Sequence, residues 1–168
     1  GKIMKFDTKV LHAAIKPEPL TGSILPPLHQ TATYVLEEVG KDKGFDYTRS
    51  ANPTHQMMEE HLAILDGGKY GIAFSSGMSA VDSCLKLLKS GDHIICSDDV
   101  YGGVSRLFNQ VLVNYQLEFT YVDTSFPDRI KEAIRPNTKM LWAETPTNPL
   151  LKVSDLNELN KIAKKNNL

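Results

Sequence analysis

Short apolar segments of strand length alternate with segments of helical spacing from Tyr70 to the end of the chain. The pattern predicts strands over 71–74, 93–96, 118–122 and 139–144, and helices over 78–89, over 104–114, from Pro127 and after a cap at Ser154. Strands that are separated by helices pair in parallel through right-handed crossovers. The sequence therefore predicts part of an open α/β sheet, mostly parallel, with helices on both faces and ligand-binding groups at the carboxyl ends of its strands.

The stretch from Gly71 to Ala80 contains the end of a predicted strand, a turn of small residues and the start of a helix. The strand ends at Phe74, and Met78 opens a segment whose apolar residues recur at helical spacing. At such a helix start, free backbone N–H groups and the positive end of the helix dipole face one point, where small side chains let an anion approach. The residues alone are compatible with a phosphate cradle and with an ordinary Ser/Gly-rich connection.

Residues 1–50 show no hydrophobic period, and prolines interrupt the candidate helices within them. These prolines are Pro17, Pro19, Pro26 and Pro27. We therefore expect an irregular N-terminal arm over 1–50 that lies on a partner subunit, followed by an α/β domain over 51–168. Asn52-Pro53 predicts the start of a helix, and Gly67-Gly68 predicts its end.

The composition excludes several classes of partner. With 168 residues and 41% hydrophobic content, the chain is long enough for one domain with a sizeable core. A formal net charge of −1 gives no electrostatic footprint for nucleic acid or an acidic membrane surface. The sequence shows no apolar run of membrane-spanning length and no apolar signal segment, so we expect a cytoplasmic protein. Cys84, Cys96 and the histidines form no metal-ligand spacing, so no metal site is predicted.

Four sequence motifs stand in register along the chain. They are Gly44-Phe45-Asp46-Tyr47-Thr48-Arg49 with Asn52-Pro53-Thr54, Phe74-Ser75-Ser76-Gly77-Met78-Ser79-Ala80, Asp99-Val100-Tyr101-Gly102-Gly103, and Glu144-Thr145-Pro146-Thr147-Asn148-Pro149. In order and spacing these motifs resemble the Cys/Met-metabolism family of pyridoxal-phosphate enzymes, and the resemblance extends from Phe6 to Leu168. It implies the front part of an aspartate aminotransferase-like large domain and pyridoxal 5′-phosphate as cofactor. It also implies a homodimer or homotetramer whose active sites are shared between subunits.

The resemblance assigns the cofactor phosphate to two groups of residues. The backbone N–H groups of Gly77 and Met78, with Ser76 beside them, hold the phosphate at the helix start. Tyr47 and Arg49 cross the subunit interface and bind the phosphate of the neighbouring subunit's cofactor. A guanidinium suits this role because it offers bidentate donors and stays charged.

The resemblance also assigns residues to the cofactor ring and the substrate. Tyr101 stacks on the pyridine ring, and its phenol contacts the leaving group or the substrate amine. Asn148 hydrogen-bonds the cofactor's phenolic oxygen or the substrate carboxylate. Glu144 is interpreted as a structural residue that orders the turn, because a carboxylate beside a turn commonly accepts backbone N–H groups.

The family's catalytic lysine has no counterpart in this sequence. The family forms its Schiff base on a lysine in a Ser-x-Thr-Lys motif and pairs the pyridine nitrogen with an aspartate in an Asp-Asn-Thr motif, and neither motif occurs here. The chain also ends on a predicted crossover helix with no strand after it. We therefore expect the front part of a longer protein that supplies the lysine. The alternative is a non-catalytic fragment, or a structural half that pairs with a separate chain.

Within the family, the residues around Tyr101 favour one reaction. Methionine γ-lyases usually have a cysteine where this chain has Gly103, and bacterial cystathionine β-lyases depart from the Tyr-Gly-Gly pattern. The form of this loop most resembles cystathionine γ-lyases, which implies γ-elimination from cystathionine or a related sulfur amino acid. Cystathionine γ-synthase and O-acetylhomoserine sulfhydrylase are the alternatives.

Overall fold

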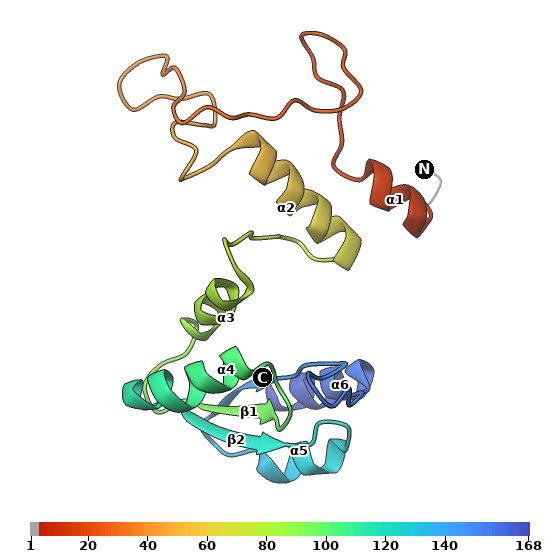
Figure 1. Ribbon diagram of the computed structural model, residues 1–168, viewed down its shortest axis with the longest axis vertical. Coiled ribbons are helices and arrows are strands. Elements are labelled where there is room, and N and C mark those ends of the chain that lie inside the picture. Colours follow the sequence, from red (N-terminus) through yellow and green to blue (C-terminus); the bar gives the residue numbers. More distant parts are fainter. Residues whose placement is uncertain (1–3) are drawn as a thin grey trace. The chain divides into compact units, whose positions relative to one another are not determined.

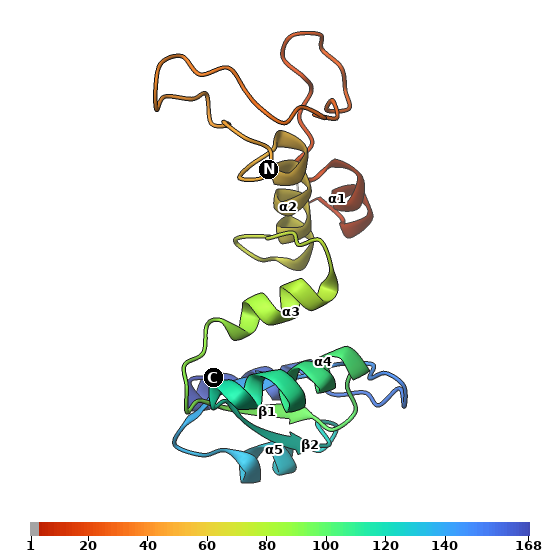
Figure 2. The same ribbon diagram turned by 60° about the vertical axis from the view of Figure 1, so that its left-hand side comes forward.

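The computed structural model describes residues 4–168, which form two compact units that divide between Phe74 and Ser75. Figures 1 and 2 show the helices and strands that belong to each unit. The predicted boundary at residue 50, between an arm and a domain, stays a prediction. Among residues 4–168, no helix has both the length and the apolar character that a membrane span requires.

A short helix, α1 (Phe6–His12), precedes the proline-rich part of the N-terminal unit. The prediction of an irregular segment over all of 1–50 is therefore wrong at this place. The first proline of the chain is Pro17, so the residues before it are free to form helical hydrogen bonds. None of the side chains of α1 is buried within the unit.

Helix α2 (Pro53–Asp66) begins and ends where the sequence predicts. The Asn52 side chain accepts a hydrogen bond from the Thr54 amide at 2.8 Å, and Pro53 takes the first helical position. Gly67 ends the helix with a φ of 67°, a conformation that favours glycine. Both predicted boundaries of this helix are confirmed.

Two segments of the N-terminal unit pack along α2. Helix α1 lies against it, and His61 Nε2 is 3.0 Å from the carbonyl oxygen of Val10. The predicted strand over 71–74 is wrong, because this segment has no strand partner within residues 4–168. Its Ala73 amide donates instead to the Glu59 carboxylate of α2 at 2.7 Å.

Three parallel strands form the sheet of the C-terminal unit in the order β2-β1-β3. They are β1 (His93–Ser97), β2 (Glu118–Val122) and β3 (Thr138–Trp142). His93 pairs with both Glu118 and Thr138, so the three strands begin at one edge of the sheet and end at the other. Parallel pairing is thus confirmed. β3 ends before Glu144, whose amide donates to the Ser97 hydroxyl at 3.3 Å instead of to the ladder.

Helical segments connect the strands and flank the sheet. They are α3 (Gly77–Leu85), α4 (Gly102–Arg106), a π-helical turn η1 (Leu107–Val111), a 3₁₀ turn η2 (Leu112–Tyr115), α5 (Pro127–Ala133) and α6 (Leu156–Asn166). Helix α3 is shorter than the predicted 78–89 because the chain continues after it in tighter turns, as in the bond from the Leu88 amide to the Leu85 carbonyl at 3.1 Å.

The prediction that Ser154 caps the last helix is wrong by one residue. The cap of α6 is Asp155, whose Oδ1 accepts a hydrogen bond from the Asn157 amide at 2.8 Å. Ser154 is buried, and its hydroxyl lies 2.8 Å from that of Thr124. The hydroxyl of Ser154 therefore holds two loops together instead of capping the helix.

Apolar side chains cover both faces of the sheet. Ile94 and Cys96 of β1 point to one face, where they pack with Phe108 of η1. Ile95 points to the opposite face and packs with Ile130 of α5. Figures 1 and 2 show α4 and α5 on opposite sides of the strands. The prediction of helices on both faces is therefore confirmed.

Cys96 lies in this core. Burial raises the pKa of its thiol to about 12, so the thiol stays protonated and unreactive.

Candidate functional site

A cavity of about 470 Å³ lies at the carboxyl edge of the sheet, within the C-terminal unit. It is lined by Ser76, Gly77, Met78, Val81, Tyr101, Val104, Trp142, Ala143 and Glu144. Its volume falls within the range of small-molecule sites in proteins, roughly 300–1,000 Å³. The structure therefore brings together four of the predicted site residues, three from the start of α3 and one from the loop after β1.

The start of α3 presents backbone donors to this cavity. Ser76 caps the helix by accepting a hydrogen bond from the Ser79 amide at 3.1 Å, and the Ser79 hydroxyl accepts one from the Ser76 amide at 3.1 Å. Gly77 and Met78 occupy the first two helical positions, where an amide has no acceptor inside the helix. These two N–H groups are therefore the donors that α3 offers to an anion.

Tyr101 stands at the start of α4, and its ring packs closely on Gly103. A Cβ atom added to Gly103 would lie 2.5 Å from Cε1 of Tyr101 and 3.0 Å from Sδ of Met78. The first distance is shorter than real Cβ contacts and the second is at the tight end of their range, so the observed position of the Tyr101 ring requires glycine at 103. The loop motif Tyr-Gly-Gly therefore sets where the aromatic ring lies at the cavity.

Gly103→Ala is expected to displace the Tyr101 ring while leaving the fold intact, because the atoms that must move belong to side chains. In the complete protein we expect turnover to fall about threefold to tenfold, less than the roughly 100-fold that an ångström of misplacement produces. Steady-state kinetics and thermal unfolding of the variant measure the two effects. Unchanged turnover with unchanged melting would show that the contact between residues 101 and 103 does not matter.

Glu144 joins the two loops at the cavity. One carboxylate oxygen accepts a hydrogen bond from the Tyr101 amide at 2.9 Å, and the other accepts one from the Asn148 amide at 2.9 Å. The prediction that Glu144 satisfies backbone donors at the turn is confirmed, and its reach to Tyr101 goes beyond that prediction. Asn148 is exposed and does not line the cavity itself, but its backbone is held by a residue that does.

A second carboxylate crosses between the same loops in the opposite direction. Asp99, from the loop after β1, accepts hydrogen bonds from the Thr147 hydroxyl and from the Leu150 amide, the latter at 2.9 Å. Asp99 and Thr147 are both buried. Neither residue was predicted to have a role, although both stand inside motifs that are visible in the sequence. Trp142, the last residue of β3, also lines the cavity and was not among the predicted site residues.

An ion-pair network fixes the loops that follow all three strands. Lys152 Nζ lies 2.9 Å from the Asp98 carboxylate and 2.9 Å from the Asp123 carboxylate. Hydrogen bonds from Ser125 and Lys152 lower the pKa of Asp123 to about 2. The folded state therefore favours the ionised form of Asp123.

Asp123 is expected to stabilise the fold above its ordinary pKa of 3.8 and to lose this contribution as the pH falls through its folded pKa of about 2. As the pH falls, the carboxylate of Asp123 takes up its proton at a higher pH in the unfolded chain than in the folded one, so acid favours the unfolded state. Urea denaturation of the complete protein and of Asp123→Asn between pH 5 and pH 2 measures the effect. We expect the variant to be less stable at pH 5 and the difference to shrink toward pH 2; a constant difference would contradict the assignment.

Tyr47 and Arg49 belong to the N-terminal unit. The Arg49 guanidinium carbon lies 5.0 Å from the centre of the Tyr47 ring, which is a cation–π contact. Tyr47 also forms an isolated antiparallel bridge with Thr33. Their predicted role on a neighbouring subunit's phosphate stays a prediction.

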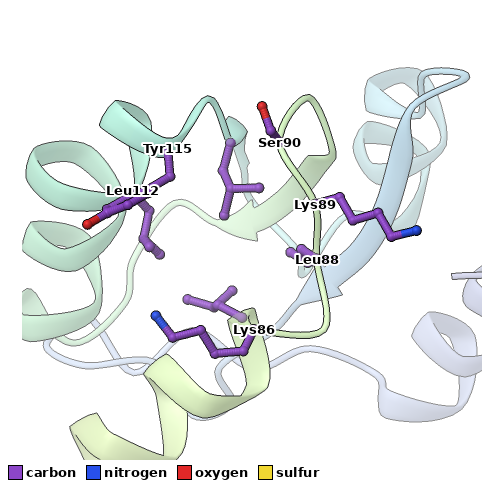
Figure 3. A pocket seen from close by; sticks show the side chains of 8 residues that line it. Lys86, Leu88, Lys89, Ser90, Leu112 and Tyr115 are labelled. Carbon is purple, nitrogen blue, oxygen red and sulfur yellow. The ribbon is translucent and has the colours of Figure 1, made fainter.

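A second cavity, of about 340 Å³, lies near the amino-terminal edge of the sheet (Figure 3). Leucines that include Leu85, Leu112 and Leu117 make up much of its lining, and the close-up shows the Lys89 amine pointing away from it. Ligand sites of open α/β sheets lie at the carboxyl ends of the strands. The apolar lining and the location separate this cavity from the candidate site.

Comparison with known proteins identifies the family. The model of the Cys/Met metabolism PLP-dependent enzymes matches residues 7–168. The chain belongs to this family. The fold is that of the front part of such an enzyme's large domain, as predicted, and the family's cofactor is pyridoxal 5′-phosphate.

Relatives with different reactions are about equally similar to this chain. It is 44% identical to a cystathionine beta-lyase of Coxiella burnetii, in an alignment that covers 100% of this chain and 44% of the relative. It is also 44% identical to a cystathionine gamma-lyase of Bacillus subtilis, with 96% of this chain and 43% of the relative covered. A probable cystathionine gamma-synthase of Herpetosiphon aurantiacus is 40% identical over 97% of this chain and 51% of its own length. Identity therefore does not separate the three reactions.

A solved structure agrees with the fold described above. The cystathionine gamma-lyase from Lactobacillus plantarum, complexed with L-serine, superposes with a TM-score of 0.92 at 38% identity, covering 98% of this chain and 43% of that one. The chain thus spans about half the length of the relatives that it matches, or less.

The residues at the cavity fit the family's cofactor. The two amide donors at the start of α3 suit a phosphate group, and the half-exposed Tyr101 ring beside them suits an aromatic heterocycle. The cavity is also lined by the apolar side chains of Val81, Val104 and Trp142, as is typical of cofactor sites.

Proposed function

We propose that the complete protein is a pyridoxal-phosphate enzyme of transsulfuration that removes the γ substituent of cystathionine or a related sulfur amino acid. One observation carries this proposal: the amide donors of α3 and the ring of Tyr101 line a single cavity, and Gly103 sets the position of that ring. When bound, pyridoxal phosphate withdraws electrons from the substrate's α carbon.

Different residues of this chain bind different parts of the cofactor and the substrate. Gly77 and Met78 bind the phosphate through their amides, with Ser76 beside them. Tyr101 holds the cofactor ring by stacking, and its hydroxyl contacts the leaving group or the substrate amine. Asn148 bonds the cofactor's phenolic oxygen or the substrate carboxylate.

Assembly completes the proposed site. We assign Tyr47 and Arg49 to the phosphate of the neighbouring subunit's cofactor, which makes the active site a property of a homodimer, paired again into a tetramer. The exposed apolar side chains of the N-terminal unit support an intersubunit position for residues 1–50. They include Leu20, Ile24, Leu25, Leu28, Val35 and Val39.

The reaction is tested by its products. The complete protein, loaded with pyridoxal phosphate, is supplied with cystathionine. γ-Elimination releases cysteine, 2-oxobutanoate and ammonia, whereas β-elimination releases homocysteine, pyruvate and ammonia. 2-Oxobutanoate as the main keto acid supports the proposal, and pyruvate would overturn it in favour of a β-lyase.

Cystathionine γ-synthase is the second candidate, because a relative of that name matches 97% of this chain. The discriminating measurement supplies an activated homoserine ester with cysteine and follows cystathionine formation; sulfide in place of cysteine tests the sulfhydrylase alternative. An intact mass of the purified protein distinguishes a whole enzyme from a non-catalytic fragment, since the present chain has a mass of 18.7 kDa.

Tyr101→Phe is expected to slow turnover about threefold to tenfold while the affinity for pyridoxal phosphate stays within about twofold, because stacking survives and only the hydroxyl is lost. Steady-state kinetics and cofactor titration of the complete protein measure the two quantities. Unchanged turnover would reduce Tyr101 to a platform for the cofactor ring.

A further inference from the structure

We infer that Asp99 and Glu144 form a reciprocal clamp that fixes Tyr101 and Asn148 relative to each other, which makes both carboxylates positioning residues of the site. The inference rests on the proposed function for its consequence in catalysis, but the clamp itself is a property of the two loops. Here the clamp means the hydrogen bonds that these two carboxylates accept across the loops after β1 and β3.

The bonds run in both directions between the loops. Glu144, beside the end of β3, accepts the Tyr101 amide of the β1 loop at 2.9 Å and the Asn148 amide of its own turn at 2.9 Å. Asp99, in the β1 loop, accepts the Thr147 hydroxyl and the Leu150 amide, both of which belong to the turn after β3. Each loop therefore supplies a carboxylate to the other.

Burial strengthens the half of the clamp that Asp99 and Thr147 form. Asp99 is 8% exposed and Thr147 is 1% exposed, so neither exchanges its partner freely for water. Removal of one partner leaves a buried polar group unsatisfied, which is more destabilising than loss of an exposed bond. Thr147 also accepts the Lys152 amide at 2.8 Å, which ties the far side of the turn to the same hydroxyl.

The base of the clamp is held by hydroxyl groups at the ends of the strands. The Ser97 hydroxyl, at the end of β1, accepts the Glu144 amide at 3.3 Å and lies 2.8 Å from the Thr124 hydroxyl. Glu144 thus has both its backbone and its carboxylate fixed to the β1 side. A displacement of Tyr101 must therefore move the turn that carries Asn148, and the reverse holds as well.

This coupling distinguishes a clamp from separate local bonds. The Thr147 side chain forms no hydrogen bond to Tyr101 in the described part of the chain; its bond to the β1 loop is the one that it donates to Asp99. If the loops move as one body, loss of the Thr147 hydroxyl loosens the segment that carries Tyr101. If the bonds act locally, only the turn around residue 147 loosens.

The experiment compares Thr147→Val with Thr147→Ser in the complete protein by hydrogen–deuterium exchange and mass spectrometry. Valine keeps the shape and removes the hydroxyl, while serine keeps the hydroxyl. With valine we expect amide exchange to rise about fivefold in both 98–104 and 144–151, the change that corresponds to about one net hydrogen bond. With serine we expect rates close to those of the unmodified protein. A rise confined to 144–151 would overturn the clamp.

Glu144→Gln provides an independent variant in case the buried substitution prevents folding. The amide side chain keeps one acceptor oxygen and replaces the other with a donor, so we expect faster exchange in both segments and a severalfold weaker affinity for pyridoxal phosphate. Unchanged exchange at 98–104 would overturn the clamp. If the unmodified protein fails to bind pyridoxal phosphate, the proposed function fails, whereas the exchange measurement still decides on the clamp.

Discussion

Phe108→Ala is expected to lower the free energy of unfolding of the complete protein by about 3–5 kcal/mol. The side chain of Phe108 is fully buried between the sheet and its covering helices. Its ring stacks on that of Phe119 with centres 4.6 Å apart and meets the edge of the Trp142 ring at 5.7 Å. Removal of the ring therefore leaves a cavity and breaks two aromatic contacts.

Chemical denaturation of the complete protein, followed by circular dichroism, measures this effect. Phe126→Ala is the matched control, since Phe126 is 54% exposed and is expected to change stability by about 1 kcal/mol or less. Equal losses of unfolding free energy in the two variants would show that the face of the sheet on which Phe108 packs does not form the core of the unit.

The fold of the C-terminal unit was predictable because its signals are local. Apolar strands such as His93–Ser97 and Glu118–Val122 stand between turn residues, and the alternation with helices allows parallel pairing. The extended segment 71–74 shows the limit of such signals. A strand requires a partner, and this segment bonds instead to the side chain of Glu59, which no local pattern reveals.

Helix boundaries were predictable only where one residue decides them. Asn52 and Gly67 fix the ends of α2 by a side-chain cap and a left-handed conformation, and both were read correctly. At α6, by contrast, Ser154 and Asp155 are both good capping residues. Asp155 caps the helix because the hydroxyl of Ser154 is buried against that of Thr124. This is a tertiary contact between residues that are far apart in the sequence.

The candidate site was predictable as far as its motifs extend. Ser76, Gly77, Met78 and Tyr101 meet at one cavity, as the motifs imply. The roles of Asp99 and Glu144 were not predictable in full, because their partners in the opposite loop lie more than 40 residues away in the sequence, as in the bond from the Tyr101 amide to Glu144. A motif shows which residues recur together, whereas the direction of a carboxylate comes only from the structure.

Arg49→Ala is expected to weaken the affinity of the complete protein for pyridoxal phosphate by about 10- to 100-fold, because the proposed charge-assisted hydrogen bonds from Arg49 to the phosphate would be lost. The variant should fold normally, since Arg49 is exposed within the N-terminal unit and stacks only on Tyr47. Cofactor titration after dialysis measures the affinity. Arg49→Lys keeps the positive charge but not the bidentate geometry of the guanidinium, so its affinity for the cofactor should lie between those of Arg49→Ala and the unmodified protein. Retention of the cofactor by Arg49→Ala as in the unmodified protein would remove Arg49 from the site.

Mixed subunits then decide whose phosphate Arg49 binds. Gly77→Pro removes one amide donor from the start of α3 while proline remains compatible with the first helical position, so this variant also binds the cofactor weakly. Consider a hybrid dimer of one Arg49→Ala subunit and one Gly77→Pro subunit. If the site is shared between subunits, one of its two sites combines the intact α3 start of the Arg49→Ala subunit with the intact Arg49 of the Gly77→Pro subunit. Such hybrids should therefore regain high-affinity binding at about half of their sites. If Arg49 instead serves the α3 of its own chain, every site in the hybrid carries one defect, and mixing restores nothing.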